Sequence, residues 1–237
     1  MNDETSPPRR RARARLDPPV LGAIDPSLDV PIGQQIYRAL RRALMAGRIS
    51  AGDRLSIRAI ADSLGVSPAP VRDALKQLEA NDVLEARQKS AFFTPPIDPE
   101  GFAGLQRVRV ELEGFAAAEA ARNADARDLR AIDDAADRYL DALGTNPSDS
   151  VAANHAFHFA VYHASHNPVL VQLIEVLWLR MGPLLATAEP SYDHSAARGH
   201  HREAVRAIHR RDADAAAAAI RGDILEACDS IRAALFG

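Results

Sequence analysis

The sequence predicts a mainly α-helical protein with two parts: a small N-terminal domain of short helices and a C-terminal antiparallel bundle of about six helices. Apolar residues recur at helical spacing from residue 32 to the end of the chain, and strand-like runs occur only between residues 83 and 93. Aromatic residues make up only 5% of the 237 residues, and alanine is abundant in the C-terminal half. That composition favours closely packed helices over sheets.

The first 28 residues form a tail without apolar periodicity. The segment is rich in proline and carries an arginine-rich run at residues 9–15. Such a composition predicts disorder. The arginines are either a solvated feature of the tail or a non-specific arm for phosphate groups.

The first predicted helix of the N-terminal domain starts after Pro31. Four apolar residues recur there every four positions, which predicts an amphipathic helix that ends at Gly47. A turn at residues 52–53 leads to a short second helix, from Ile57 to Leu64, which Gly65 ends.

The third predicted helix begins with a strong start signal. Ser67 is a favourable N-cap, and Pro68 takes the first helical position, where its missing N–H has no cost. Two short strands, residues 83–84 and 91–93, follow around a polar turn. Two short helices joined at a glycine turn and followed by a strand pair fit a winged helix-turn-helix, although three short helices are also common in other α domains.

The motifs of this segment resemble the winged helix-turn-helix of GntR-type transcription regulators. They are AGRISAGDRLS (46–56), RAIADSLGVS (58–67) and PVRDALKQLE (70–79). The resemblance places the DNA-binding domain at residues 29–97 and implies double-stranded operator DNA as the partner. It implies DNA contacts by Arg58, Ser67, Arg72 and Lys89. The sequence departs from the family at two positions. Pro68 stands where the family often has arginine, which removes one base contact. Ser90 stands where the wing tip often has glycine, which argues against deep insertion of the wing into the minor groove.

The C-terminal segment, residues 98–237, shows helical patterns only. Its first helix is expected to bury Leu105, Val108, Leu112 and Phe115, and its second runs from residue 129 to 143. Asn–Pro pairs at 146–147 and 167–168 separate the next two helices, and the last two are expected near 195–210 and 212–235. The fourth helix is expected to carry the apolar residues Val169, Leu173, Val176, Leu177 and Leu184.

This bundle resembles the FCD effector domain of the FadR-type branch. The stretches that carry the resemblance are VRVELEGFAAAEAA (108–121), NHAFHFAVYHASHNPVL (154–170) and HREAVRAIHRRDADAAAAAIRGDI (201–224). The resemblance implies a homodimeric regulator, most often a repressor, whose DNA binding is controlled by a small carboxylate effector in the C-terminal domain. An effector-independent DNA-binding protein and a metal-dependent enzyme are the alternatives.

The resemblance also implies a divalent metal site, Zn²⁺, Mn²⁺, Ni²⁺ or Fe²⁺, formed by Asn154, His158, His201 and Asp223. Two of these residues match the family pattern of one aspartate and three histidines, and Asn154 and Asp223 depart from it. The alternative is a set of hydrogen-bonded histidines around a polar cavity. His194 and His200 are fallback ligands, and the remaining histidines are expected at the surface or at helix ends.

Arg109 lies four residues before Glu113, and the resemblance implies that it faces the effector cavity. A guanidinium binds a carboxylate with two parallel hydrogen bonds. The effector-binding set is therefore Arg109, Asn154, His158 and His201. The alternative for Arg109 is a solvated ion pair with Glu113. For Trp178 and Tyr162, core packing is favoured over a place in the pocket wall.

Charge and composition agree with this division. Residues 29–97 hold ten Lys or Arg against seven acidic residues, and residues 98–237 hold fourteen Arg against twenty-one. The basic domain suits nucleic-acid contact.

The single cysteine, Cys228, cannot form an internal disulfide, and no apolar run is expected to reach the roughly 18 residues of a membrane helix. A cytoplasmic protein without a membrane partner follows, and the lack of HExxH, nucleophile-elbow and phosphate-loop motifs predicts that it is not an enzyme.

Overall fold

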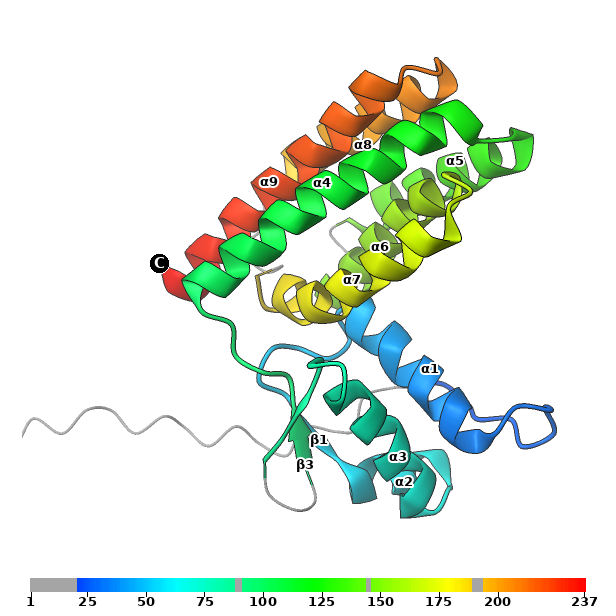
Figure 1. The fold of residues 1–237 in the computed structure, drawn as a ribbon, viewed down its shortest axis with the longest axis vertical. Helices are drawn as coiled ribbons and strands as arrows, with labels where there is room; N and C mark the ends of the chain where they lie inside the picture. Colours follow the sequence, from blue (N-terminus) through cyan, green and yellow to red (C-terminus); the bar gives the residue numbers. More distant parts are fainter. Residues whose placement is uncertain (1–20, 88–90, 144–145, 189–193) are drawn as a thin grey trace, which may run out of the picture.

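The computed structural model describes residues 21–87, 91–143, 146–188 and 194–237. Within them the chain forms nine helices and one small sheet, in the order α1-β1-α2-α3-β2-β3-α4 to α9. Figure 1 shows an elongated helical bundle above a smaller unit that contains α1, α2, α3 and the sheet. The predicted fold class, a winged helix-turn-helix followed by an all-α bundle, is confirmed.

The smaller unit has three helices, which are α1 (Ile32–Met45), α2 (Ile57–Leu64) and α3 (Pro68–Glu79). Its antiparallel sheet has the order β1-β3-β2, with β1 at Arg54–Ser56, β2 at Glu85–Ala86 and β3 at Ala91–Phe93. Two strand expectations were wrong. β1 was not predicted, and Val83 and Leu84 precede β2 as buried core residues. Strands of two or three residues are too short to show a period of two.

The ends of α2 follow the predicted signals. The Ser56 hydroxyl accepts a hydrogen bond from the Ala59 amide at 3.4 Å, and Gly65 ends the helix with φ +66°. Ser67 occupies the N-cap position of α3, but its side chain makes no capping hydrogen bond. The usual donor for such a bond is the amide at the second or third helical position. The third position is Pro70, which has no N–H, and the Ala69 amide at the second position does not bond to the Ser67 side chain, so the hydroxyl stays available.

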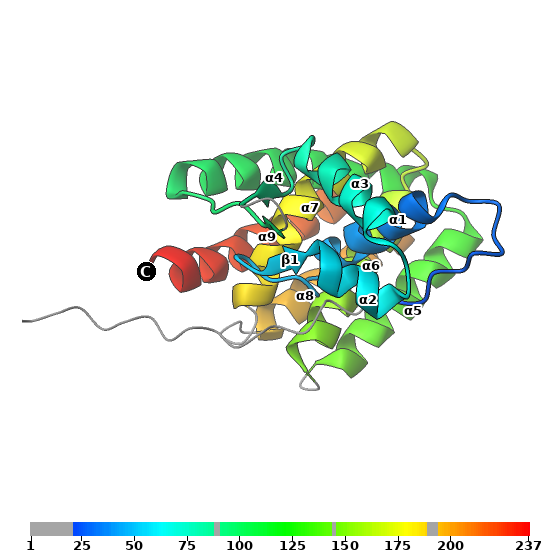
Figure 2. The ribbon, with the colours of Figure 1, turned by 90° about the horizontal axis from the view of Figure 1, so that it is seen from below.

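The bundle consists of six helices in the described residues, and the expected helix breaks are confirmed. They are α4 (Pro99–Asn123), α5 (Ala126–Ala142), α6 (Pro147–His163), α7 (Pro168–Ala188), α8 (His194–His209) and α9 (Ala213–Phe236). The long helices α4 and α9 lie side by side, α8 packs on α9, and α5 packs on α6 (Figures 1 and 2). Alanines in α4 and α9 allow this close approach.

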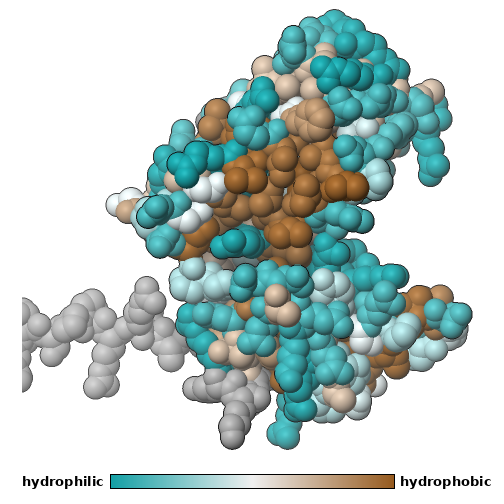
Figure 3. Space-filling model, in the orientation of Figure 1, coloured by the Kyte–Doolittle hydropathy of each residue, from teal (hydrophilic) through white to brown (hydrophobic). Residues whose placement is uncertain are grey.

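The expected apolar face of α4 was partly wrong. Val108 and Phe115 are each 46% exposed, whereas Arg109 and Glu113 are buried on the opposite side of the helix. Periodicity assigns polar side chains to the surface, and it cannot detect partners on other helices. On α7, Leu173 and Val176 are also about half exposed. Figure 3 shows a broad hydrophobic surface over this part of the bundle.

Helix α7 corrects one further expectation. It is long and apolar enough to cross a membrane by length and composition alone, with a mean hydropathy of 1.6 over its best 18-residue window. Half of that window is buried inside the protein, because α7 packs against α1, α4, α6 and α9. The apolar composition of α7 is therefore explained by its position as a core helix of the bundle.

The two units meet where α1 crosses α7. A Cβ on Gly182 would lie 2.1 Å from the Leu44 carbonyl oxygen, so only glycine allows this approach. The Ala51 amide donates to the Pro183 carbonyl at 3.1 Å, and Arg41 forms an ion pair with Glu175 at 2.7 Å. Backbone contacts thus join the smaller unit to the bundle directly, in addition to the chain that connects β3 to α4.

Candidate DNA-binding and effector sites

The two arginines predicted to contact DNA lie together on the open side of α2 and α3. Arg58 and Arg72 are exposed, and both line a hollow of about 460 Å³ together with Ser56, Ile57 and Pro68. Neither guanidinium has an ion-pair partner within 4 Å among the described residues. This end of the molecule points away from the bundle (Figure 1). The hollow therefore offers two uncompensated positive charges to solvent.

The start of α3 adds polar groups to this surface. Ser67 is exposed, and its hydroxyl is not used for capping. The first turn of the helix contains no acidic residue, so the positive end of the helix dipole is not offset there. Lys76, one turn after Arg72, is also exposed and was not singled out from the sequence. Lys89 lies outside the described residues.

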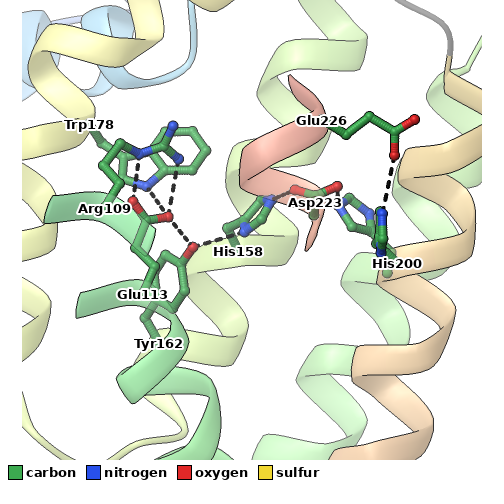
Figure 4. A network of polar contacts seen from close by, with 9 residues as sticks. Arg109, Glu113, His158, Tyr162, Trp178, His200, Asp223 and Glu226 are labelled. Atoms are coloured by element: carbon green, nitrogen blue, oxygen red, sulfur yellow. Dashed lines mark hydrogen bonds and ion pairs between the residues drawn. The ribbon is translucent and has the colours of Figure 1, made fainter. Parts of the chain in front are cut away.

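The bundle core holds a second polar arrangement, a buried network centred on Glu113 (Figure 4). The carboxylate accepts from Arg109 Nε at 2.6 Å and Nη2 at 3.1 Å, and from Trp178 Nε1 at 3.1 Å. The Tyr162 hydroxyl donates a short hydrogen bond to the same carboxylate. The guanidinium also lies over the Trp178 ring, with 4.9 Å between Cζ and the centroid.

The network continues from Tyr162 through His158 to Asp223. Nδ1 of His158 lies 2.9 Å from the Tyr162 hydroxyl, and its Nε2 lies 3.0 Å from Asp223 Oδ2. On the other side, His201 Nε2 lies 3.3 Å from Asp223 Oδ1. Helices α4, α6, α7, α8 and α9 each contribute to this chain of contacts. Because the Tyr162 proton is given to Glu113, Nδ1 of His158 is the donor toward Tyr162.

Burial and pairing set the charges of these groups. Burial alone would raise the pKa of Asp223, but His201 and His158 outweigh it and hold that pKa well below its usual range. Burial lowers the pKa of His201, against the opposing effect of Asp223. Burial also raises the pKa of Tyr162, and the neighbouring Glu113 adds to the increase. The cluster therefore contains an anionic carboxylate beside an imidazole that favours its neutral form, which are the forms that bind metal ions.

Three of the four predicted metal-site residues fit a divalent ion. The ligand atoms of His158, His201 and Asp223 lie within 4.8 Å of one another, and all three residues are buried. Asp223 Oδ1 and both ring nitrogens of His201 have no hydrogen-bond partner, although buried polar atoms normally have one. Asn154 lies one turn before His158 on α6 and is partly buried, with no described hydrogen bond.

The contacts around His158 match the usual surroundings of a metal-binding histidine. Such a ligand normally donates its second ring N–H to an acceptor, which fixes the tautomer and the ring orientation. Here Tyr162 and Glu113 fill that role and leave Nε2 directed at Asp223. Two imidazoles and one carboxylate suit Zn²⁺, Mn²⁺, Fe²⁺ or Ni²⁺.

Comparison with known proteins supports both halves of this description. Residues 32–94 match the model of the bacterial regulatory proteins of the gntR family, and residues 105–225, half of the chain, match the FCD domain. The chain belongs to the GntR family. It is a DNA-binding transcriptional regulator with an FCD effector-binding domain, and the similar proteins are regulators rather than enzymes.

Individual relatives of this GntR-family regulator agree. The HTH-type transcriptional regulator McbR of Escherichia coli is 32% identical over 155 residues, 65% of this chain and 70% of that protein. YdhC of Bacillus subtilis, named an uncharacterized HTH-type transcriptional regulator, is 26% identical over 147 residues, 61% of this chain and 66% of that protein. The solved structure of E. coli McbR/YncC has a TM-score of 0.78 at 26% identity and covers 86% of this chain and 98% of that chain.

A second solved structure shows the same fold at lower identity. It is a GntR transcriptional regulator from Rhodococcus sp. RHA1, with a TM-score of 0.70 at 20% identity, and the match covers 85% of this chain and 98% of that chain.

The other histidines of the regulator lie outside the core cluster. His200, a fallback ligand, contacts Glu226 at 3.1 Å instead, and the side chain of His194 lies outside the described part. His166 and His209 pair with aspartates near helix ends, as expected. His155 was expected at the surface, but its ring packs against Phe159 and meets Trp178 edge-on, and burial lowers its pKa to about 4.

A second group of candidate ligands, Asp125, Asp128 and His166, has a structural explanation. Asp125 and Asp128 form a capping box at the start of α5, and His166 contacts Asp128 at 2.7 Å. These residues are largely exposed.

Arg109 is neither a free guanidinium that faces an effector cavity nor a solvated ion pair, the two alternatives that the sequence left open. It is 3% exposed, so it is not part of a solvated ion pair, and Glu113 already occupies its guanidinium. An effector carboxylate would have to bind beside this pair or displace Glu113 from it. Trp178 and Tyr162 are fully buried core residues, as expected, and both also donate to Glu113.

Proposed function

We propose that this protein is a cytoplasmic repressor that releases operator DNA when a small organic acid binds its bundle. The observation that carries the proposal is the contrast between two polar sites. One is an open hollow with Arg58 and Arg72, and the other is a buried cluster with polar atoms that lack partners. We place the DNA-binding domain at residues 29–97 and the effector domain at 98–237, and we assign DNA contacts to Arg58, Ser67, Arg72 and Lys89.

The effector site is proposed at Asn154, His158, His201 and Asp223, with a divalent metal held by the two histidines and the aspartate. A metal there supplies a Lewis acid with coordination positions that a carboxylate can complete. Arg109 lies one layer further in, where its pair with Glu113 fixes the Tyr162 and His158 contacts; it would bind an effector carboxylate directly only if the ligand displaced Glu113. A small carboxylate is the ligand class that satisfies both the metal and the orphaned histidine atoms.

The repressor is proposed to act as a homodimer, since two winged helices are needed to read the two halves of a near-palindromic operator. The exposed apolar side chains of α4 and α7 support a self-association face there: Val108, Phe115, Val169, Leu173 and Val176. Monomeric proteins rarely expose a hydrophobic surface as broad as the one in Figure 3. Light scattering coupled to size exclusion should report a dimer for the native chain and a monomer for Leu173→Glu. The control Leu28→Glu, on an exposed leucine of the smaller unit, should remain a dimer.

Binding of effector and DNA is linked through the bundle. Trp178, a member of the Glu113 network, lies one turn before Gly182, which contacts α1. An effector that favours a different packing of α7 shifts the α1 contact, and by linkage it weakens DNA binding as much as DNA weakens effector binding.

The decisive experiment measures binding of the purified protein to a DNA fragment from beside its own gene. The expected result is a retarded complex whose affinity falls with rising salt and falls again when small carboxylates are added. A complex that no carboxylate weakens would favour an effector-independent DNA-binding protein, a function that the occupied state of Arg109 also fits. Absence of any salt-sensitive complex would contradict the proposal as a whole.

Elemental analysis of the tag-free protein tests the metal site. We expect one divalent metal per chain, which is lost in the His158→Ala/His201→Ala variant. A His166→Ala/His209→Ala variant, on exposed histidines, is the matched control and should keep the metal. Equal metal content in all three proteins would contradict the assignment.

A further inference from the structure

A second cavity lies between α5 and α8, and it borders the core network at His201. Its volume is about 340 Å³, within the range of small-molecule sites. Ala136, Leu140 and Val205 form its apolar lining, and charged side chains from both helices stand around it. The network of Figure 4 does not include these charged residues.

The two walls of this α5–α8 pocket carry opposite charges. On α8, Arg198 and Arg202 are one helical turn apart, exposed, and without an ion-pair partner within 4 Å in the described chain. On α5, Asp133 and Asp137 are likewise one turn apart. Asp133 contacts His209 at 3.0 Å, whereas Asp137 has no ion pair in the same set of residues. Side chains four residues apart share one face of a helix, so each wall presents a single sign.

His201 gives the pocket a polar floor. The residue lines the cavity and is 3% exposed, and its Nδ1 has no hydrogen-bond partner in the structure. Its ring is fixed between Phe157, with centroids 4.1 Å apart, and Tyr139, with centroids 4.5 Å apart. A buried imidazole nitrogen without a partner costs free energy unless a ligand or water reaches it.

We propose that the α5–α8 pocket binds a small zwitterionic amino acid with an apolar side chain. The carboxylate is held by Arg198 and Arg202, the ammonium group by Asp137, and the side chain lies along Leu140 and Val205. A simple carboxylate would leave Asp137 without a cation and would add negative charge beside it, and a simple amine would do the converse at the arginines. The pocket shares His201 with the proposed effector site, but Arg198, Arg202 and Asp137 line the pocket and are not part of that site. Removal of their charges therefore tests this proposal independently of whether an organic acid binds at His158.

Calorimetric titration of the full-length protein tests the zwitterion requirement. The probes are L-valine, L-leucine, L-methionine and L-phenylalanine. Two leucine analogues, 4-methylpentanoate and 3-methylbutylamine, each lack one of the charges. We expect at least one of the amino acids to bind one per chain, and L-leucine to bind at least tenfold more tightly than either analogue. Failure of all four amino acids, or equal binding of leucine and 4-methylpentanoate, would overturn the proposal.

Charge-removing variants locate the ligand. Arg202→Gln and Asp137→Asn should each weaken binding of the amino acid at least tenfold. Arg206→Gln on α8 and Asp134→Asn on α5 are matched controls, because both residues are exposed and neither lines the pocket. They should change the affinity less than twofold. If Arg202→Gln and Asp137→Asn bind the amino acid as tightly as the control variants do, the charged side chains of the two walls do not hold a ligand and the proposal is wrong.

Discussion

The winged helix and the bundle use arginine in opposite ways. In the winged helix, Arg58 and Arg72 are exposed beside a hollow and have no acidic partner in the described structure. In the bundle, Arg109 is buried, paired with Glu113 by two hydrogen bonds, and covered by Trp178. The first arrangement leaves positive charge for an external anion, and the second uses the charge inside the protein.

This difference separates the residues that bind from those that hold the fold. An exposed, unpaired arginine contributes little to the free energy of unfolding, since its charge is solvated in both the folded and the unfolded chain. A buried pair depends on both partners, because removing one leaves an uncompensated charge in the core. Substitutions in the two regions should therefore fail different assays.

The largest expected effect is the loss of stability in Glu113→Gln. The substitution leaves the Arg109 guanidinium buried without a counter-charge, and we expect about 3–5 kcal/mol less free energy of unfolding. Urea denaturation measures it. Glu119→Gln, which removes the surface partner of Arg122, is the control and should cost less than about 1 kcal/mol. Similar losses for both variants would show that burial does not separate the two pairs.

Next in size is the effect of Arg58→Gln and Arg72→Gln on operator affinity. Each should raise the Kd by about 10- to 100-fold, or about 1–3 kcal/mol, and lower its salt dependence. The free energy of unfolding, measured by thermal denaturation, should stay within about 0.5 kcal/mol of that of the native protein. Arg130→Gln, on an exposed arginine of α5, should change neither quantity. A fall in stability without a change in Kd would reverse the roles assigned to the two regions.

The contact between the two regions is tested by Gly182→Ala. The added Cβ would lie 2.1 Å from the Leu44 carbonyl oxygen and 2.8 Å from that of Met45, so α1 or α7 has to shift. We expect the free energy of unfolding, measured by thermal denaturation, to fall by about 1–3 kcal/mol. Gly199→Ala on α8 is the matched control, since nothing lies within 4 Å of its added Cβ, and it should be neutral or stabilising. Equal stability of the two variants would contradict the close approach of α1 and α7.

The effect of pH is the most gradual of these, because it is spread over the interval between the two pKa values of one histidine. Burial lowers the pKa of His155 to about 4, so the unfolded chain binds a proton at a higher pH than the folded chain does. The stabilisation is complete above the unfolded pKa near 6.5 and is lost as the pH falls toward 4, by at most about 1.4 kcal/mol per pH unit. His155→Phe should reduce this slope in unfolding curves taken between pH 7 and 4, and the buried His201 supplies part of what remains. The exposed His163→Gln should retain it, and an unchanged slope in His155→Phe would assign the effect to another group.

The sequence predicted the winged helix better than the core network. The winged helix depends on signals between neighbouring residues, whereas the core network depends on residues far apart in the chain. Gly47, Gly65 and Pro68 are local signals whose conformation depends on a few neighbours. The exposure of Arg58 and Arg72 follows from the same short helices. Ser67 takes the N-cap position that the sequence predicts, but its side chain makes no capping hydrogen bond, and Pro70 at the third helical position has no N–H to donate.

The core network depends on partners far apart in the chain. Glu113 meets Tyr162 across 49 positions and Trp178 across 65. Helical periodicity carries no information on such pairs, and it therefore placed Val108 and Phe115 inside and left the burial of Arg109 undetermined. All four metal-site positions came from the family pattern, two of them with the family's residue type, and the structure adds the observation that Asp223 lies between His158 and His201.

The contact of α1 with α7 gives the two halves of the protein a second connection. The peptide segment from Thr94 to Asp98 is one link, and the Ala51–Pro183 hydrogen bond, the Arg41–Glu175 pair and the Gly182 approach form another that needs no continuous chain. A single proteolytic nick at residues 95–97 would therefore leave the fragments associated. The nicked protein should elute as one species in native buffer and separate only in denaturant.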